Sequence, residues 1–218
     1  MPRPTLLSLG SINADFQVRT HQPPGSSETL LAHDFCRFAG GKASNTAWLG
    51  AQFGHRSLLL GRVGDDELAE QALGTLREAG VDVSAVGRAA GQATGLSMIM
   101  VPPDGKKHIV LATNANDCWT ERAIDSVVST IASTSAPACL VVDCEVPATV
   151  VHRALQAAHE RHIQVVLDPS FPDRVEANMF EHLYARPPTP AKRNSFCKWR
   201  FARPNRPQKP QLRCATKG

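Results

Sequence analysis

Short apolar runs alternate with amphipathic segments over the first 185 residues of the chain. Runs typical of buried strands occur at residues 6–10, 57–63, 140–143 and 165–168. Between them, apolar residues recur every three to four positions, as on one face of a helix, at residues 68–79, 124–131 and 150–158. This alternation predicts an α/β fold, with a Rossmann-type sheet whose parallel strands are linked by helical crossovers.

A second set of strand signals does not fit the crossover rhythm. These segments are short and bounded by turn residues, at residues 16–19, 28–32, 36–39, 96–101 and 107–111. The sequence Pro102-Pro103-Asp104-Gly105 is typical of a tight hairpin connection between the last two. We expect these strands to form a small separate sheet, whose apolar face must be covered by a ligand or by a second copy.

The composition changes abruptly after Ala185. Residues 186–218 contain six prolines, ten Lys or Arg and no acidic residue, whereas the first 185 residues carry a net charge of −6. We therefore divide the chain into a folded part, residues 1–185, and a basic Pro-rich tail, residues 186–218, which we expect to be disordered. The folded part gives no sign of a nucleic-acid-binding surface, and the tail offers only Phe196, Trp199 and Phe201 for base stacking.

The remaining compositional features exclude several classes of protein. No apolar run reaches the length of a membrane span, and the N-terminal apolar stretch is too short for a signal peptide. We therefore expect a cytoplasmic protein with no membrane partner. The six cysteines form no Cys-x-x-Cys pair and match no zinc spacing, so we expect reduced thiols and no metal site.

Three polar groups carry the candidate chemistry. They are Ser11-Ile12-Asn13-Ala14-Asp15, the glycine loop from Ala39 to Ala47, and Asp143-Cys144-Glu145. Each follows a predicted strand, and we expect all three at the carboxyl ends of parallel strands, where open α/β sheets bind ligands. Carboxylates, an amide, a lysine and free backbone N–H groups together suit the neighbouring hydroxyls of a sugar.

Each group also has a purely structural interpretation. Gly40-Gly41 can be a tight turn between a strand and a helix, and Asp15 can cap its own backbone. The glycine loop does not match a phosphate-binding Walker loop, because Cys36 and Ala43 replace the required Gly and Ser or Thr. No G-x-G-x-x-G follows a strand, so the sequence does not favour a dinucleotide site.

The order of these motifs resembles the N-terminal part of ribokinase-like (PfkB) carbohydrate kinases. The resemblance covers residues 5–185 and includes Val63-Gly64-Asp65-Asp66, Thr94-Gly95 and Leu167-Asp168-Pro169. It implies that the second sheet is a lid over the sugar and often a homodimer contact. It also implies a set of sugar contacts, namely Asn13, Asp15, Gly41, Lys42, Asn45 and Glu145.

One family motif is missing from this sequence. The resemblance implies a Gly-Ala-Gly-Asp segment that supplies the catalytic base and the anion hole, with ATP and Mg²⁺ bound nearby. No such segment occurs in the 218 residues, so no residue here is assigned a catalytic role. We therefore expect a truncated kinase that holds a sugar but lacks activity, with the tail out of frame or unrelated. A non-catalytic sugar-binding remnant, or a fragment of a nucleoside or sugar-acid kinase, remains an alternative.

Overall fold

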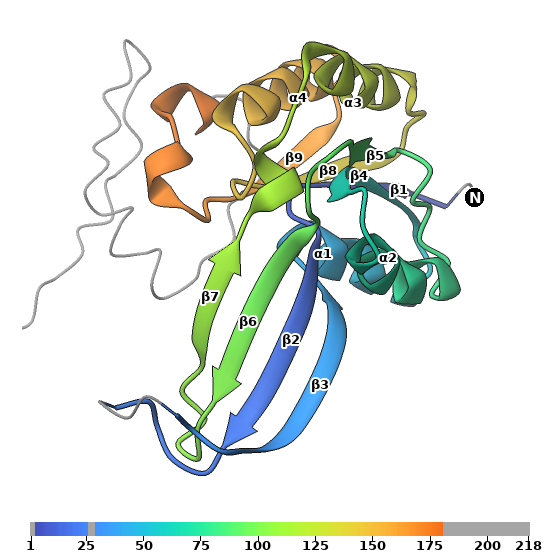
Figure 1. Ribbon diagram of the computed structural model, residues 1–218. Helices are drawn as coiled ribbons and strands as arrows, with labels where there is room; N and C mark the ends of the chain where they lie inside the picture. The colour runs from blue at the N-terminus through green and yellow to red at the C-terminus, as the bar shows by residue number, and fades with distance from the viewer. Residues whose placement is uncertain (1–2, 26–28, 181–218) are drawn as a thin grey trace, which may run out of the picture. The chain divides into compact units, whose positions relative to one another are not determined.

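The computed structural model describes residues 3–25 and 29–180, in which helices and strands alternate around a parallel sheet (Figure 1). The sheet has the strand order β5-β4-β1-β8-β9, formed by Val86–Ala89, Arg56–Gly64, Thr5–Leu9, Ala138–Asp143 and Gln164–Asp168. Every neighbouring pair in it is parallel. The predicted α/β fold with a parallel central sheet is therefore confirmed.

Helices cover both faces of the parallel sheet. Figure 1 shows α1 (Lys42–Gln52) and α2 (Leu68–Glu78) on one side, with α3 (Glu121–Ser133) and α4 (Ala148–Glu160) on the other. The buried residues of α2 follow the helical period that the sequence shows, at Ala69, Ala72, Leu73 and Leu76. They pack with residues of β4 in one apolar core cluster. Because both faces are covered, β4 is buried from its second residue to its last.

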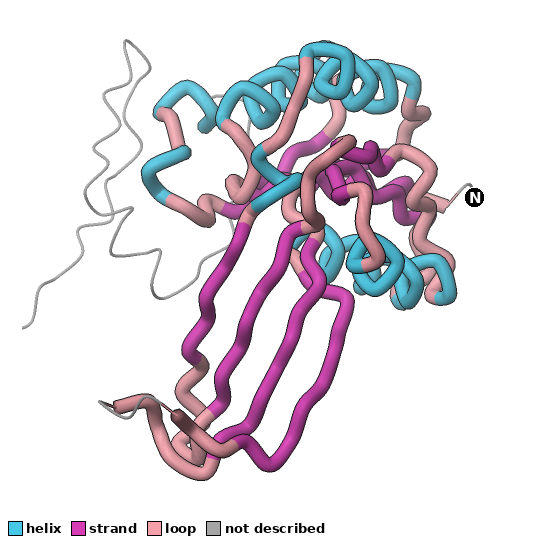
Figure 2. Tube along the Cα trace, viewed as in Figure 1, coloured by secondary structure: helices cyan, strands magenta, loops and turns pink. Residues whose placement is uncertain are grey.

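The second sheet has the order β3-β2-β6-β7 and is here called the lid sheet. Its strands are β2 (Asn13–Thr20), β3 (Ala32–Gly40), β6 (Gly95–Val101) and β7 (His108–Ala112). Figure 2 shows these four strands side by side, extending away from the helix-covered sheet. The predicted hairpin turn is present, because the Gly105 N–H donates to the Pro102 carbonyl at 2.9 Å. The prediction of a separate small sheet is thus confirmed.

One strand prediction was wrong, and one strand was not predicted at all. The predicted strand at 28–32 does not exist as such: residues 29–31 are outside any strand, and β3 begins only at Ala32. The reason is pairing, because β2 ends at Thr20, whose partner is Ala32, and no strand remains for the preceding residues. The sequence also gave no signal for β5, an edge strand whose Val-Gly-Arg-Ala sequence lacks an apolar run.

Several predictions concern features that the structure describes only in part. The basic Pro-rich tail at 186–218 and its expected disorder lie outside the described residues. Within them, no helix combines the length and apolar character needed to cross a membrane. The described cysteines, Cys36, Cys118, Cys139 and Cys144, form no disulfide with one another.

Candidate functional site

The glycine loop packs directly against the segment that follows β1. Gly41 adopts φ +93°, and a Cβ atom on it would lie 2.3 Å from the Ser11 carbonyl oxygen. Only glycine fits a position with both constraints. The first N–H group of α1, that of Lys42, donates to the Ser11 hydroxyl at 2.9 Å. Backbone approach and a hydrogen bond therefore join the start of α1 to the end of β1.

Asp143, the last residue of β8, connects the other two polar segments. One of its carboxylate oxygens accepts the N–H of Ser11 at 3.0 Å, and the other accepts the N–H of Glu145 at 2.8 Å. Asp143 is buried, with 3% of its surface exposed. A buried carboxylate is stabilised by such charge-assisted bonds, and here it fixes two loops that are 132 residues apart.

Lys42 and Glu145 form an ion pair at the N-terminus of α1. The Lys42 ammonium contacts a Glu145 carboxylate oxygen, and the Glu145 side chain is only 8% exposed. Burial lowers the pKa of Lys42, while the negative charge of Asp143 acts in the opposite direction. The pair therefore presents one cationic donor and one anionic acceptor at the same place.

Asp15 projects against the glycine loop from strand β2. A Cβ atom on Gly40 would lie 2.2 Å from the Asp15 carboxylate, so the two residues are in contact. Burial raises the pKa of Asp15, whereas a hydrogen bond from Ser97 and the charge of Lys107 lower it. The Oδ1 atom is buried and has no hydrogen-bond partner among the described residues. A buried acceptor without a partner is costly, and a ligand hydroxyl would satisfy it.

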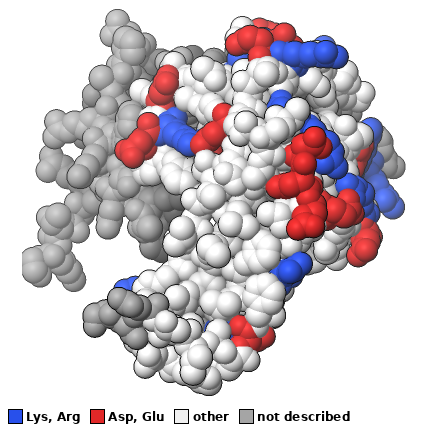
Figure 3. All heavy atoms as spheres, in the orientation of Figure 1, with Lys and Arg blue, Asp and Glu red and all other residues white. Residues whose placement is uncertain are grey.

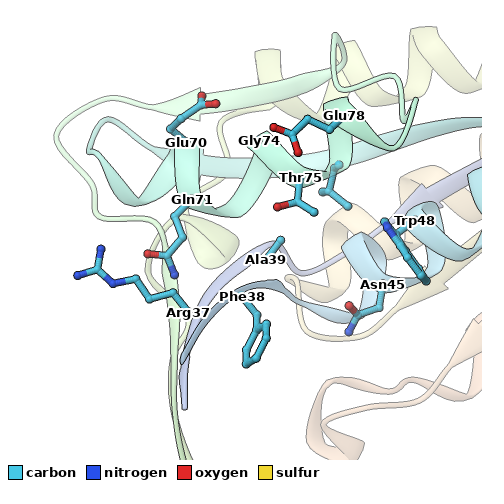
Figure 4. Close-up of a pocket in the computed structure, with 11 residues that line it drawn as sticks. Arg37, Phe38, Ala39, Asn45, Trp48, Glu70, Gln71, Gly74, Thr75 and Glu78 are labelled. Carbon is cyan, nitrogen blue, oxygen red and sulfur yellow. The ribbon is translucent and has the colours of Figure 1, made fainter. Parts of the chain in front are cut away.

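The other two predicted sugar contacts differ in their surroundings. Asn13 is buried, and its Oδ1 accepts a hydrogen bond from Asn116 at 2.8 Å. Asn45, on α1, is exposed and lines a groove of about 550 Å³. Figure 4 shows that groove between α2 and the lid strand β3, with Trp48 beside Asn45 and Phe38 opposite. Asn45 therefore faces this groove, whereas Gly41, Lys42 and Glu145 meet at the end of β1.

The expectation that all three polar groups lie at the ends of parallel strands was wrong for the glycine loop and held only in part for the first group. Ser11 and Ile12 do follow β1, and Glu145 does follow β8. Asn13 and Asp15, however, lie within lid strand β2, and the glycine loop follows β3, its antiparallel neighbour. The chain leaves the parallel sheet at Ile12 and immediately pairs with Gly40 and Gly95 through Asn13. The lid sheet thus carries part of the site itself.

Asp66 and Thr94, which belong to two further motifs of the sequence, are hydrogen-bonded to each other. Asp66 accepts the Thr94 hydroxyl at 2.5 Å and the Thr94 N–H at 2.9 Å. Burial acts to raise the pKa of Asp66, but the bonds from Thr94 and Ala69 outweigh it and hold that pKa below its ordinary value. This contact anchors the residue before β6 and hence the base of the lid sheet.

Two residues of the site region were not assigned a role from the sequence. The sequence motifs include Asp143 only as the neighbour of Glu145, and no motif includes Asn116. Asn116 lies in a short 3-10 helix, Asn114–Asp117, and is 1% exposed. The only signal in the sequence was a polar residue close to a predicted lid strand. The hydrogen bonds themselves left no local signal, because the partners Ile12 and Asn13 lie more than 100 residues earlier.

The described residues show no ready cluster of metal ligands. They contain no group of three or more His, Cys, Asp or Glu that could hold a metal ion. Near the glycine loop, Asp143 already accepts two N–H groups and Glu145 pairs with Lys42. Mg²⁺ at a nucleotide is held by only one or two carboxylates together with phosphate oxygens, so the ATP site that the resemblance implies stays a prediction for this chain.

Acidic and basic side chains of the described residues are mixed on the visible face of the molecule and do not form separate acidic and basic patches. Figure 3 shows acidic and basic side chains interspersed over the helices, and few charged side chains on the visible face of the lid sheet. Pairs such as Arg77 with Glu70 and Arg153 with Asp125 account for part of this mixing. The face of the described residues drawn in Figure 3 therefore shows no extended basic surface.

The parallel sheet, the lid sheet and the polar residues after β1 and β8 agree with the sequence resemblance, and a family comparison points the same way. A sequence model described as pfkB family carbohydrate kinase matches residues 3–191. The chain therefore belongs to the pfkB family of carbohydrate kinases.

Curated relatives include several ribokinases. The chain is 29% identical over 168 residues to the ribokinase of Haemophilus influenzae, which covers 77% of this chain and 54% of the relative. It is 31% identical over 174 residues to the ribokinase of Schizosaccharomyces pombe, covering 76% and 53%. A deoxyribokinase of Salmonella typhi is 27% identical over 162 residues, covering 74% and 52%. The chain thus spans about half the length of the curated relatives it matches.

Solved structures show the same fold. The ribokinase of Thermotoga maritima superposes with a TM-score of 0.75 at 21% identity, covering 90% of this chain and 62% of that one. The Arabidopsis thaliana ribokinase, solved with ribose and ATP, gives 0.63 at 24%, covering 78% and 54%. A ribokinase of Cryptococcus neoformans, solved with ADP, gives 0.63 at 28%, covering 78% and 51%.

Proposed function

We propose that the described part of the chain binds a pentose sugar and is the sugar-binding half of an ATP-dependent kinase. The observation that carries this proposal is the buried Oδ1 atom of Asp15, which lacks a partner among the described residues. It lies against Gly40, next to the loop that leads to the Lys42–Glu145 pair. A sugar hydroxyl can donate to Asp15 while a neighbouring hydroxyl accepts from Lys42.

The relatives support ribose as the first sugar to test. Their names include ribokinase and deoxyribokinase, and one neighbour was solved with ribose and ATP. We further propose Asn13, Gly41, Asn45 and Glu145 as sugar contacts. In a complete kinase, ATP and Mg²⁺ would bind outside the residues described here, and a polypeptide of these 218 residues would bind sugar without phosphorylating it.

Replacing Asp15 tests the proposed sugar site. We expect Asp15→Asn to weaken ribose binding, measured by calorimetry, at least about tenfold, because a charged acceptor is replaced by a neutral one and its hydrogen bond to the sugar becomes weaker. The matched control is Asp34→Asn, also on the lid sheet, where Asp34 is exposed and only 3.8 Å from Arg19. We expect that variant to bind ribose like the unmodified protein. Equal affinities for all three proteins would contradict the site.

The pH dependence of binding gives a second readout of Asp15. Because burial raises its pKa, we expect ribose affinity to fall as the pH drops through a midpoint above the ordinary value of about 3.9. The same pKa shift has the opposite effect on stability. The folded protein holds the Asp15 proton more tightly than the unfolded chain, so the free energy of unfolding should fall as the pH rises and Asp15 ionises. Asp15→Asn should abolish this part of the pH profile of binding.

The lid sheet also supports a proposed homodimer. Register places Phe16, Met98 and Val110 in one row across β2, β6 and β7, on the face opposite Asp15. Met98 is 58% exposed and Val110 70% exposed, so this face leaves apolar surface uncovered. A second copy of the same face would bury it.

Sedimentation tests this dimer. We expect a dimer for the unmodified chain at micromolar concentration and a monomer for Met98→Glu with Val110→Lys. The control Met98→Leu preserves the apolar surface and should remain dimeric. A monomer for the unmodified chain, or a dimer for the charged double variant, would show that this face does not associate.

A further inference from the structure

The side chain of Asn116 acts as a backbone partner at the start of the lid sheet. Its Oδ1 atom accepts the N–H of Ile12 at 2.9 Å, and its Nδ2 atom donates to the carbonyl of Ile12 at 3.2 Å. Both polar backbone groups of Ile12 are therefore satisfied by one amide. Ile12 is where the chain passes from the parallel sheet into β2, so a backbone ladder is interrupted there.

These two bonds fix the orientation of the Asn116 amide. A backbone carbonyl can only accept and a backbone N–H can only donate, so the oxygen and nitrogen of Asn116 cannot exchange places. Its Nδ2 group also donates to Oδ1 of Asn13, at 2.8 Å. It follows that Asn13 must turn its oxygen towards Asn116. Its own NH₂ group is thereby directed elsewhere, as a donor.

The surroundings hold this amide in place. A Cβ atom on Gly95 would lie 2.3 Å from both Nδ2 of Asn116 and Oδ1 of Asn13, so the pair packs tightly against that strand. The main chain of Asn116 is fixed as well, because its carbonyl accepts the indole N–H of Trp119 at 2.8 Å. Such constraints leave little freedom for the Asn13 amide to rotate.

We propose that Asn116 is a positioning residue that determines specificity by setting the polarity of the sugar contact at Asn13. This inference rests on the proposed function, in which Asn13 contacts the sugar. The Asn13 NH₂ group requires an oxygen on the ligand that accepts, whereas Asp15 requires a hydroxyl that donates. The site then selects a pentose with hydroxyls at both positions and disfavours the deoxy sugar that lacks the accepting oxygen.

The test compares ribose with its 2-deoxy and 3-deoxy analogues by calorimetry. We expect the unmodified chain to bind one deoxy analogue at least about tenfold more weakly than ribose, and Asn13→Ala to reduce that ratio to within about twofold. Asn116→Ala should reduce the same ratio equally, although Asn116 does not touch the sugar. A merely structural role would weaken binding of all three sugars alike and leave the ratio unchanged.

Two further variants keep the test decisive. Asn116→Asp has nearly the same size, but its ionised carboxylate cannot donate to Ile12 and Asn13. At pH 8 it should therefore also reduce the ratio of ribose to deoxy-analogue affinity to within about twofold. This variant serves as the test if Asn116→Ala fails to fold. Trp119→Phe removes the bond to the Asn116 main chain but leaves the amide, and it should keep the ratio. Two outcomes overturn this inference alone. One is an unchanged ratio of ribose to deoxy-analogue affinity in the folded Asn116 variants, and the other is equal affinity of the unmodified chain for all three sugars. Absence of any sugar binding by the unmodified chain overturns the proposed function and the inference with it.

Discussion

A polypeptide of these 218 residues is expected to release no ADP above background with ribose, ATP and Mg²⁺, even where it binds the sugar. The resemblance implies a Gly-Ala-Gly-Asp segment that supplies the base and the anion hole, and the 218 residues contain no such segment. Groups that only hold the sugar stabilise ground and transition states about equally, which lowers KM without raising kcat. Loss of a single oxyanion-type donor costs about 10²–10³ in kcat. We therefore expect turnover at least about 10³-fold below the roughly 1 s⁻¹ at the slow end of ordinary enzymes.

The assay needs a positive control that shares its conditions. The full-length ribokinase of Haemophilus influenzae serves this purpose, together with a chimera that joins residues 1–185 of this chain to the C-terminal half of that enzyme. We expect ribose-dependent ADP release from both. Release at about 1 s⁻¹ from the 218-residue polypeptide itself would show that its catalytic groups lie in residues to which we assign no such role.

The parallel sheet could be predicted because burial on both faces leaves a strong trace in the sequence. The apolar stretch at 57–63 becomes β4, extended by one residue at each end. Strand β5 left no such trace, since an edge strand of four residues needs few apolar side chains. Residues 29–31 show the reverse error: they have strand-like composition but lie outside any strand, because β3 begins only at Ala32.

The candidate site was predictable in its residue types but not in its connections. The glycine loop and the acidic segment at 143–145 stood out as polar groups at strand ends. Their hydrogen bonds did not, because each joins residues far apart in the chain: Asp143 to Ser11 over 132 residues, and Asn116 to Ile12 over 104. Buried polar side chains of this kind are placed by tertiary packing, and no local pattern specifies their partners.

The Asp143 carboxylate should therefore be the most sensitive single group in the site region. Asp143→Ala leaves the buried N–H groups of Ser11 and Glu145 without their acceptor. Each buried donor left unsatisfied costs about 1–3 kcal/mol, so we expect the free energy of unfolding to fall by about 2–6 kcal/mol. Ribose affinity should fall more than about tenfold, because Ser11 supports the start of α1 and Glu145 pairs with Lys42.

Comparison with two other variants separates the loss of fold from the loss of the site. Asp143→Asn keeps the shape and one acceptor oxygen, so it should fold while still binding ribose more weakly. Asp125→Asn removes an exposed carboxylate that pairs with Arg153 at 2.8 Å, and such surface pairs contribute about 0–1 kcal/mol. Chemical denaturation gives the stability of all three variants, and calorimetry gives their ribose affinity. If Asp143→Ala matched Asp125→Asn in both, the two N–H groups would not depend on Asp143, and the loops after β1 and β8 would be held by other contacts.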